Sequence, residues 1–196
     1  MLSRRPRGVT LIELVIAIAI FGILMMLAVP AFTTFLQNTK VKNAAETTMH
    51  GLNLARAEAV RRNATVRFQF VSDLTNGCAL STATGNWVVS VSDPTGACGA
   101  APGGAAAPQI VQVKSGREGT ENVSMTTVGG SSVVFTGLGR VSGAGITRMD
   151  FSYPSGGTCE DAGGTIRCMQ IRVSTGGSAK LCDPKVTDPT DPRICN

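Results

Sequence analysis

The sequence predicts an α+β fold in which one long N-terminal helix packs against an antiparallel β-sheet head. A run of 21 residues, 9–29, carries only the charge of Glu13 and is otherwise apolar. Over residues 31–63 polar and apolar side chains alternate at helical spacing, and from Val66 onward the spacing changes to two, as in strands. These patterns divide the chain into four segments: a leader (1–8), a transmembrane helix (9–30), an amphipathic helix that continues it (31–63) and a β-rich head (64–196).

The N-terminal segment joins a basic leader to an apolar run long enough to cross a membrane. About 20 apolar residues at ~1.5 Å per residue match a hydrocarbon core of ~30 Å. Arg4, Arg5 and Arg7 precede the run, and positive flanks stay in the cytoplasm. We therefore expect a single-pass helix whose head lies on the periplasmic side of the inner membrane. A carboxylate inside such a helix is costly without a partner, so Glu13 is a candidate functional residue.

The small residue that could mark a cleavage site is Gly8, which lies before the apolar run, whereas a secretory signal carries it afterwards. The stretch Gly-Val-Thr-Leu-Ile-Glu that begins there resembles the leader motif of prepilins. The resemblance implies cleavage by prepilin peptidase between Gly8 and Val9, N-methylation of Val9, and pairing of Glu13 with the N-terminus of a neighbouring subunit. Gly22 and Pro30 stand where pilins loosen this helix. Val9 departs from the phenylalanine usual in pilins, and the alternative is a plain signal anchor in which Glu13 has no role.

Beyond the membrane the predicted helix is amphipathic. Its apolar face has steps of three and four residues: Val41, Ala45, Met49, Leu52, Ala55 and Ala59. Small side chains would let a sheet pack closely on the helix: Ala44, Ala45, Ala55, Ala57 and Ala59. Charged side chains suit the solvated side: Lys40, Lys42, Glu46, Arg56, Glu58, Arg61 and Arg62. For the last four of these, contact with a partner protein is the alternative to supporting the helix.

The head shows the alternation of short strands and turns. Strands are predicted at residues 66–70, 87–91, 110–113, 123–127, 133–135, 149–153 and 169–173. Glycine-rich stretches at residues 99–107 and 156–164 are predicted to be loops.

Six cysteines lie in the head and none in the helix: Cys78, Cys98, Cys159, Cys168, Cys182 and Cys195. An even number in this arrangement predicts an oxidising compartment and up to three disulfides. Of the 15 pairings that six cysteines allow, nearest-neighbour pairing is favoured: Cys78–Cys98, Cys159–Cys168 and Cys182–Cys195. The alternative is a zinc site, but the chain has no Cys-x-x-Cys pair and its single histidine, His50, is far from the cysteines.

Composition argues against an enzyme and against a strongly basic head. The formal charge of +5 includes the three arginines of the leader, and from Ala64 onward 10 basic residues balance 10 acidic ones. The head carries no Gly-x-Ser-x-Gly, no phosphate loop and no histidine to activate a nucleophile. The acidic pair Glu160 and Asp161 is expected in a solvated loop. We expect no catalytic residue, cofactor or metal.

The whole plan resembles the FimT/GspH family of pilin-like proteins. The resemblance covers the leader, the helix with residues 54–62, and the stretches 135–140 and 171–183. It implies a minor pilin or pseudopilin, a structural subunit in the tip or initiation complex of a type IV pilus or a type II secretion pseudopilus. Other pilins, prepilin peptidase and an inner-membrane assembly platform would be its partners.

A second function remains open, because some members of this family bind DNA through a basic Gly-Arg-x-Arg turn near the C-terminus. Here the matching residues are Gly177, Ser178, Ala179 and Lys180, so both arginines are missing. Phosphate binding needs clustered positive charge, which these residues would supply if the fold brought them together: Arg140, Arg148, Arg167, Arg172 and Lys180. A third possibility is a plain anchored periplasmic binding domain.

Overall fold

The computed structural model describes residues 9–195, in which one helix precedes eight strands. Helix α1 (Leu11–Arg62) is uninterrupted, so its backbone passes through Gly22 and Pro30 without a break. The chain divides into two units after Leu36. The first holds the N-terminal part of α1, and the second, residues 37–196, holds the rest of α1 and all strands. We call the second the head unit.

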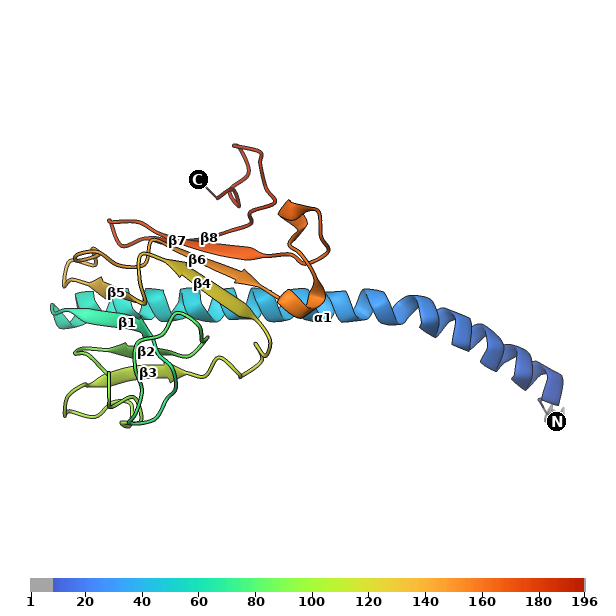
Figure 1. The fold of residues 1–196 in the computed structure, drawn as a ribbon, viewed down its shortest axis with the longest axis horizontal. Helices are drawn as coiled ribbons and strands as arrows, with labels where there is room; N and C mark the ends of the chain where they lie inside the picture. The colour runs from blue at the N-terminus through green and yellow to red at the C-terminus, as the bar shows by residue number, and fades with distance from the viewer. Residues whose placement is uncertain (1–8, 196) are drawn as a thin grey trace, which may run out of the picture. The chain divides into compact units, whose positions relative to one another are not determined.

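The strands form two antiparallel four-stranded sheets, so the predicted fold of a long helix on antiparallel β structure is confirmed (Figure 1). The first sheet has the order β3-β2-β1-β5, with β1 (Val66–Phe70), β2 (Trp87–Ser90), β3 (Ile110–Lys114) and β5 (Ser132–Phe135). The second has the order β4-β6-β7-β8, with β4 (Ser124–Val128), β6 (Arg148–Ser152), β7 (Met169–Val173) and β8 (Ala179–Cys182). Two short 3-10 helices, η1 (Pro154–Gly156) and η2 (Glu160–Ala162), lie between β6 and β7.

The seven predicted strands are confirmed, each within one residue at either end. The eighth, β8, was not predicted. It pairs with β7 from Val173 opposite Ala179 to Gln170 opposite Cys182, so a hairpin closes the second sheet.

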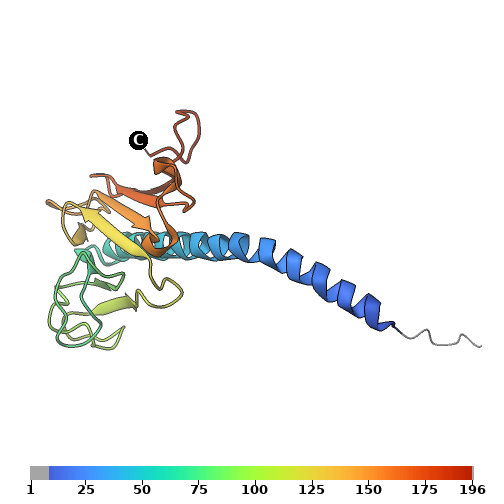
Figure 2. The same ribbon diagram turned by 45° about the vertical axis from the view of Figure 1, so that its right-hand side comes forward.

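The predicted apolar face of the helix forms the centre of the core. Val41, Ala45, Leu52, Ala55 and Ala59 are fully buried, and Met49 is partly buried. They share one apolar cluster with residues from both sheets, and Figures 1 and 2 show both sheets lying along this part of α1. The sequence was wrong about Ala57, which is exposed because it lies on the opposite side of the helix.

Helix and first sheet approach each other closely at Gly51. A Cβ atom built there would lie 2.8 Å from Cε2 of Phe68 and 3.0 Å from Cη2 of Trp87. The two rings are themselves in contact, with centroids 5.5 Å apart. The absence of a side chain at Gly51 therefore sets the distance between α1 and the sheet.

α1 ends in a Schellman motif that turns the chain into β1. Asn63 has a left-handed backbone with φ of 48°. Its N–H donates to the carbonyl of Val60, and the N–H of Ala64 donates to the carbonyl of Ala59, both at 3.2 Å. These two bonds satisfy carbonyls that the last turn of a helix otherwise leaves without a partner.

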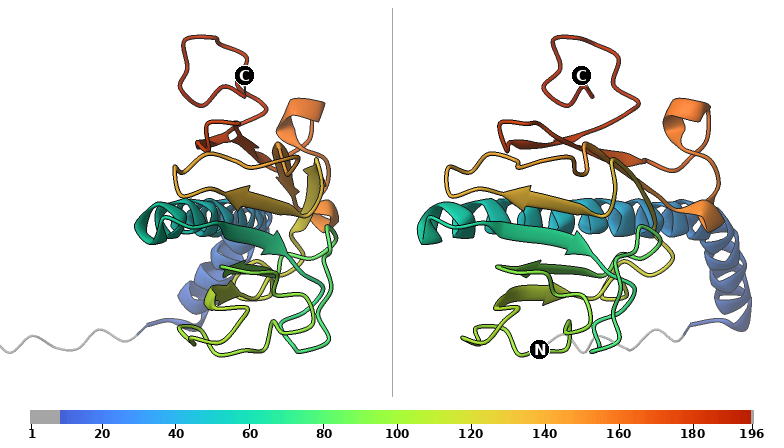
Figure 3. Two further views of the ribbon diagram at one scale, coloured as in Figure 1. Left: turned by 90° about the vertical axis from the view of Figure 1, so that its left-hand side faces the viewer. Right: turned by 60° about the vertical axis from the view of Figure 1, so that its left-hand side comes forward.

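The structure contains three disulfides, Cys78–Cys98, Cys159–Cys168 and Cys182–Cys195, which is the nearest-neighbour pairing. The last of them closes the C-terminal tail, which forms a loop beyond β8 in Figure 3. Because all six cysteines are in disulfides, none is available as a thiolate ligand for zinc. Within residues 9–195 we also find no group of three or more histidine, cysteine or acidic side chains able to hold a metal ion.

Candidate functional site

The first turn of α1 places Glu13 at a helix N-terminus. Thr10 precedes the helix, and the backbone N–H of Glu13 donates to Oγ1 of Thr10 at 3.3 Å. A threonine at this position caps the helix, and a glutamate three residues later is the sequence pattern of a capping box. The helix dipole also favours a negative charge here. Thr10 was not predicted as a cap, although the pattern Thr-x-x-Glu before an apolar run indicates one. Gly8 and its cleavage site lie outside the described residues.

The N-terminal part of α1 exposes its apolar side chains on all sides. The large apolar residues from Val9 to Met26 are between 46% and 81% exposed, and none of this stretch is buried within the chain. A Cβ atom added to Gly22 would meet no atom within 4 Å. The stretch is long and apolar enough to cross a membrane. A fully apolar circumference of this kind requires lipid or other helices around it.

The last turns of α1 carry a compact charge cluster. Glu58 accepts hydrogen bonds from Arg61 at 2.7 Å and from Arg62 at 2.7 Å. These bonds lower the pKa of Glu58 to about 2. The three residues support the helix surface, as the sequence suggested. Arg56 does not, because its Nε donates to the carbonyl of Gly139 at 3.0 Å and so fastens the turn after β5 to the helix.

Three of the predicted basic residues form one row across the second sheet. Arg148 on β6 lies opposite Arg172 on β7, and Arg172 lies opposite Lys180 on β8. Residues directly opposite on neighbouring strands place their side chains on the same face. Asp150 accepts a hydrogen bond from Arg148 at 2.9 Å, and Gln170 accepts one from Arg172 at 2.8 Å. The row thus brings two arginines and a lysine together, and Arg148 is paired with Asp150.

Arg140 lies near this row but on another element. It closes the turn over residues 136–140, and the Cα atom of Arg140 lies 3.3 Å from a Cβ built on Gly177. The N–H of Val141 donates to the carbonyl of Thr175 at 3.2 Å. The turn after β5 therefore packs on the β7–β8 turn.

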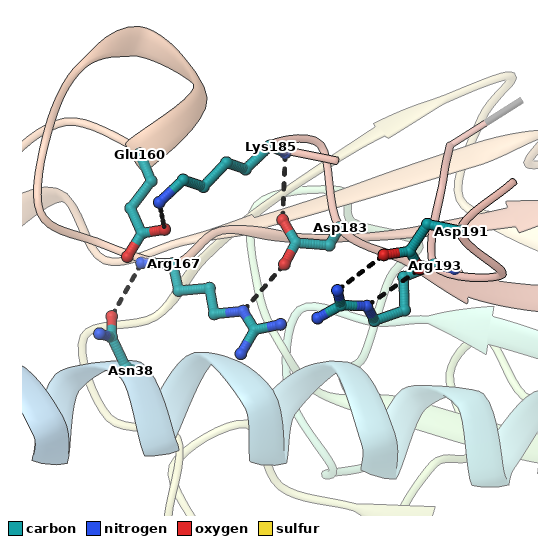
Figure 4. A network of polar contacts seen from close by, with 7 residues as sticks. All are labelled: Asn38, Glu160, Arg167, Asp183, Lys185, Asp191 and Arg193. Atoms are coloured by element: carbon teal, nitrogen blue, oxygen red, sulfur yellow. Dashed lines mark hydrogen bonds and ion pairs between the residues drawn. The ribbon is translucent and has the colours of Figure 1, made fainter. Parts of the chain in front are cut away.

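Arg167 does not join the row, contrary to the possibility raised from the sequence. Its backbone N–H donates to Oδ1 of Asn38 on α1 at 2.8 Å, and its guanidinium pairs with Asp183 at 2.9 Å (Figure 4). Lys185 pairs with Glu160 at 2.8 Å in the same network. Glu160 is therefore an ion-paired residue and not part of a freely solvated acidic loop.

This network holds the C-terminal tail on the head unit. Asp183 is only 4% exposed, and its backbone N–H donates to the carbonyl of Arg193 at 2.8 Å. Arg193 in turn pairs with Asp191 at 2.7 Å. Arg167 lies within the loop closed by the Cys159–Cys168 disulfide and binds Asn38 on α1 and Asp183 after β8, so it is a structural residue.

Comparison with known families agrees with this architecture. The profile of a family described as type II transport protein GspH matches residues 44–177, more than half of the chain. The chain belongs to the GspH family. A prokaryotic N-terminal methylation motif matches residues 3–29, a stretch that contains Glu13 and Gly22. The family is one of structural pilins, so this is a pilus or pseudopilus subunit that assembles with other pilins or pseudopilins.

Two solved structures are similar to this GspH-family chain, both crystal forms of the type IV minor pilin FimU from Pseudomonas aeruginosa strain PAO1. The first is 18% identical with a TM-score of 0.48, over 77% of this chain and 97% of the other. The second is 18% identical with a TM-score of 0.44, over 74% of this chain and 97% of the other. A comparison with curated proteins finds no match.

Proposed function

We propose that this chain is a minor pilin or pseudopilin of the tip or initiation complex of a type IV pilus or type II secretion pseudopilus. Prepilin peptidase cleaves it between Gly8 and Val9, and Val9 is then methylated. The cleaved helix waits in the inner membrane with its head in the periplasm. An inner-membrane platform then moves it into the fibre.

The observation that carries this proposal is the surface of the first part of α1. Apolar side chains are exposed around its whole circumference, and Glu13 is the only charged group among the described residues of that stretch. Helices of this kind can exchange lipid for neighbouring helices with little change in apolar contact. The carboxylate of Glu13 is then the group that can fix how far this helix is displaced along its axis relative to a neighbouring helix.

Glu13 supplies the specificity of the docking step. A carboxylate in a low-dielectric bundle gains from pairing with an opposite charge, and the gain offsets the desolvation of both groups. The α-amino group of a neighbour's Val9 is a cation of the right kind once the leader has been removed. In the single chain, Thr10 and the helix dipole hold the first turn in the helical form.

Two measurements test the proposal. Intact mass of the protein from membranes, with and without prepilin peptidase, should show loss of residues 1–8 only when the peptidase is present. The variant Glu13→Gln should remain in the membrane but fail to enter sheared fibres, whereas the control Leu14→Ile should enter normally. A full-length mass in both strains, or normal entry of Glu13→Gln, would refute the proposal.

The row Arg148–Arg172–Lys180 supports a second candidate function, DNA binding by the head. The neutral charge of the whole head conceals this local excess of cations. Phosphate contacts make affinity fall steeply with salt. The triple variant Arg148→Ala, Arg172→Ala, Lys180→Ala should then lose affinity for duplex DNA and show a shallower salt dependence. The control Arg117→Ala, on a loop outside the second sheet, should not. Equal binding by the two variants would reject this candidate.

A further inference from the structure

Large apolar side chains are rarely exposed on the head unit, and two of them lie on segments that touch each other. Among its described residues only Val60, Leu80, Val128 and Leu138 are exposed. Leu138 is 81% exposed at the tip of the turn after β5. A Cβ on the next residue, Gly139, would lie 3.1 Å from Cγ2 of Val60, which is 53% exposed on the last turns of α1. Leu138 and Val60 are thus exposed on two segments that touch where α1 ends, and we call them together the apolar spot.

Three kinds of contact fix the turn that carries Leu138: hydrogen bonds within the turn, packing on the end of α1, and a hydrogen bond from Arg56. The N–H of Thr136 donates to the carbonyl of Arg140 at 2.9 Å, and the N–H of Gly139 donates to the carbonyl of Thr136 at 2.7 Å. A Cβ on Gly137 would lie 2.8 Å from the carbonyl carbon of Asn63, so this residue packs directly on the helix end. Arg56 binds the carbonyl of Gly139, as described above. A large apolar side chain on a turn fixed in this way loses little conformational freedom on binding, which favours a binding anchor.

Arginines are frequent on the two segments that carry Val60 and Leu138. Arg56, Arg61, Arg62 and Arg140 lie on the same two elements, and the only carboxylate of those stretches is Glu58, which is already paired. We call Val60 and Leu138, with Arg56, Arg61 and Arg140, the helix-end face. An apolar centre with an arginine-rich rim is the composition of protein–protein interfaces. Every aromatic side chain of the head unit is buried, so the face has no ring on which a nucleic-acid base could stack.

We propose that the helix-end face docks onto the head of a different pilin-class subunit, one that offers an apolar hollow for Leu138 within a rim of carboxylates. The inference rests on the proposed function, because it requires sibling subunits in the same fibre. Opposite charges at the rim would set the orientation and exclude wrong partners. A buried leucine at the centre would supply the affinity.

A second copy of this chain does not meet the requirement. Two helix-end faces would bring like charges together. The glycine-lined hollow of the head, formed by residues 143–146 with Gly129 and Val173, could accept a leucine by its size and chemistry. That hollow adjoins Arg172 and Lys180, so it would place cations against an arginine rim. The partner is therefore a subunit of different charge.

The test uses the full chain in cells that make the fibre. A photo-crosslinking amino acid replaces Leu138 in one strain and Leu80 in another. Leu80 is a matched control because it is also an exposed leucine. It bridges to Val71, which follows the C-terminal end of β1, whereas Phe135, just before the Leu138 turn, pairs with Val66 at the N-terminal end of β1. We expect a cross-link to a sibling subunit from position 138 and none from position 80. The variant Leu138→Asp should reduce recovery of the chain in fibres by about tenfold or more, and Leu80→Asp should leave it unchanged.

The outcomes separate this inference from the proposed function. Absence of the unmodified chain from fibres would overturn the proposed function itself. The docking face alone would be overturned by a different set of results. In that case the unmodified chain enters fibres and Glu13→Gln does not, while the variants at position 138 enter normally and give no cross-link. A cross-link between two copies of this chain would also overturn it. If Leu138→Asp changed DNA binding and not fibre entry, the face would belong to nucleic-acid recognition instead. Each variant is first compared with the unmodified chain by unfolding midpoint, so that a folding defect is not scored as lost docking.

Discussion

Replacing Gly51 by alanine tests how closely α1 and the first sheet are packed. Two opposing effects decide the result. Alanine is favoured over glycine in a helix interior by about 1 kcal/mol. Against this, the new Cβ would lie 2.8 Å from Phe68 and 3.0 Å from Trp87, and overpacking of this kind costs about 1–3 kcal/mol. Both rings are buried, at 0% and 2% exposure, so neither can swing out into solvent to relieve the contact. We therefore expect Gly51→Ala to lower the free energy of unfolding by about 1 kcal/mol.

The assay follows the fluorescence of Trp87, the only tryptophan, during thermal unfolding of the full chain in detergent. A loss of about 1 kcal/mol should lower the midpoint by about 2–4 °C for a unit of this size. Asn53→Ala is the control, because Asn53 is exposed on the same helix and gains only the helix preference of alanine. If Gly51→Ala proved as stable as the control variant, the helix preference would dominate. The close approach of α1 to the rings would then be refuted.

Three further predictions concern polar contacts. Arg56→Ala removes the hydrogen bond to Gly139 and should cost about 1 kcal/mol, measured by urea unfolding; equal stability would show that the turn holds without it. The lowered pKa of Glu58 means that its stabilising contribution is complete above pH 4.5 and is lost as the pH falls toward about 2. The stability difference between the native chain and Glu58→Gln, expected to be roughly 1 kcal/mol near neutrality, should therefore shrink over that range, and a constant difference would contradict the ion pair. Asp183→Ala leaves the guanidinium of Arg167 without its carboxylate partner. Limited proteolysis should then cut the C-terminal tail faster than in the native chain. An unchanged rate of cleavage would mean that the Cys182–Cys195 disulfide alone holds the tail.

Much of the fold was predictable because it depends on local spacing. The apolar steps of three and four residues identified the buried face of α1, and alternation identified seven strands. β8 was not predicted because Ala179–Cys182 is short and contains no β-branched residue. Its strand conformation comes from pairing with β7, a contact that the sequence of four residues does not encode.

The candidate site was predictable only in its N-terminal part. Glu13 stands out in the sequence because its neighbours are apolar. The row of Arg148, Arg172 and Lys180 depends on the register of three strands, and residues so far apart in the chain give no sign of being neighbours. Arg56 was misassigned for a similar reason, since its partner lies 83 residues away on a turn whose position only the folded sheet determines.

The pattern of disulfides has a consequence for how the head matures. The bridges join cysteines only 20, 9 and 13 residues apart, and each closes before the next begins along the chain. Oxidation in chain order would therefore give this pairing directly, because each thiol meets its own partner before a later one is available. With that order of closure we expect no need for reshuffling of mismatched pairs, which is otherwise a slow step that takes seconds to hours. None of the bridges involves α1, so no covalent link fixes the helix to the sheets.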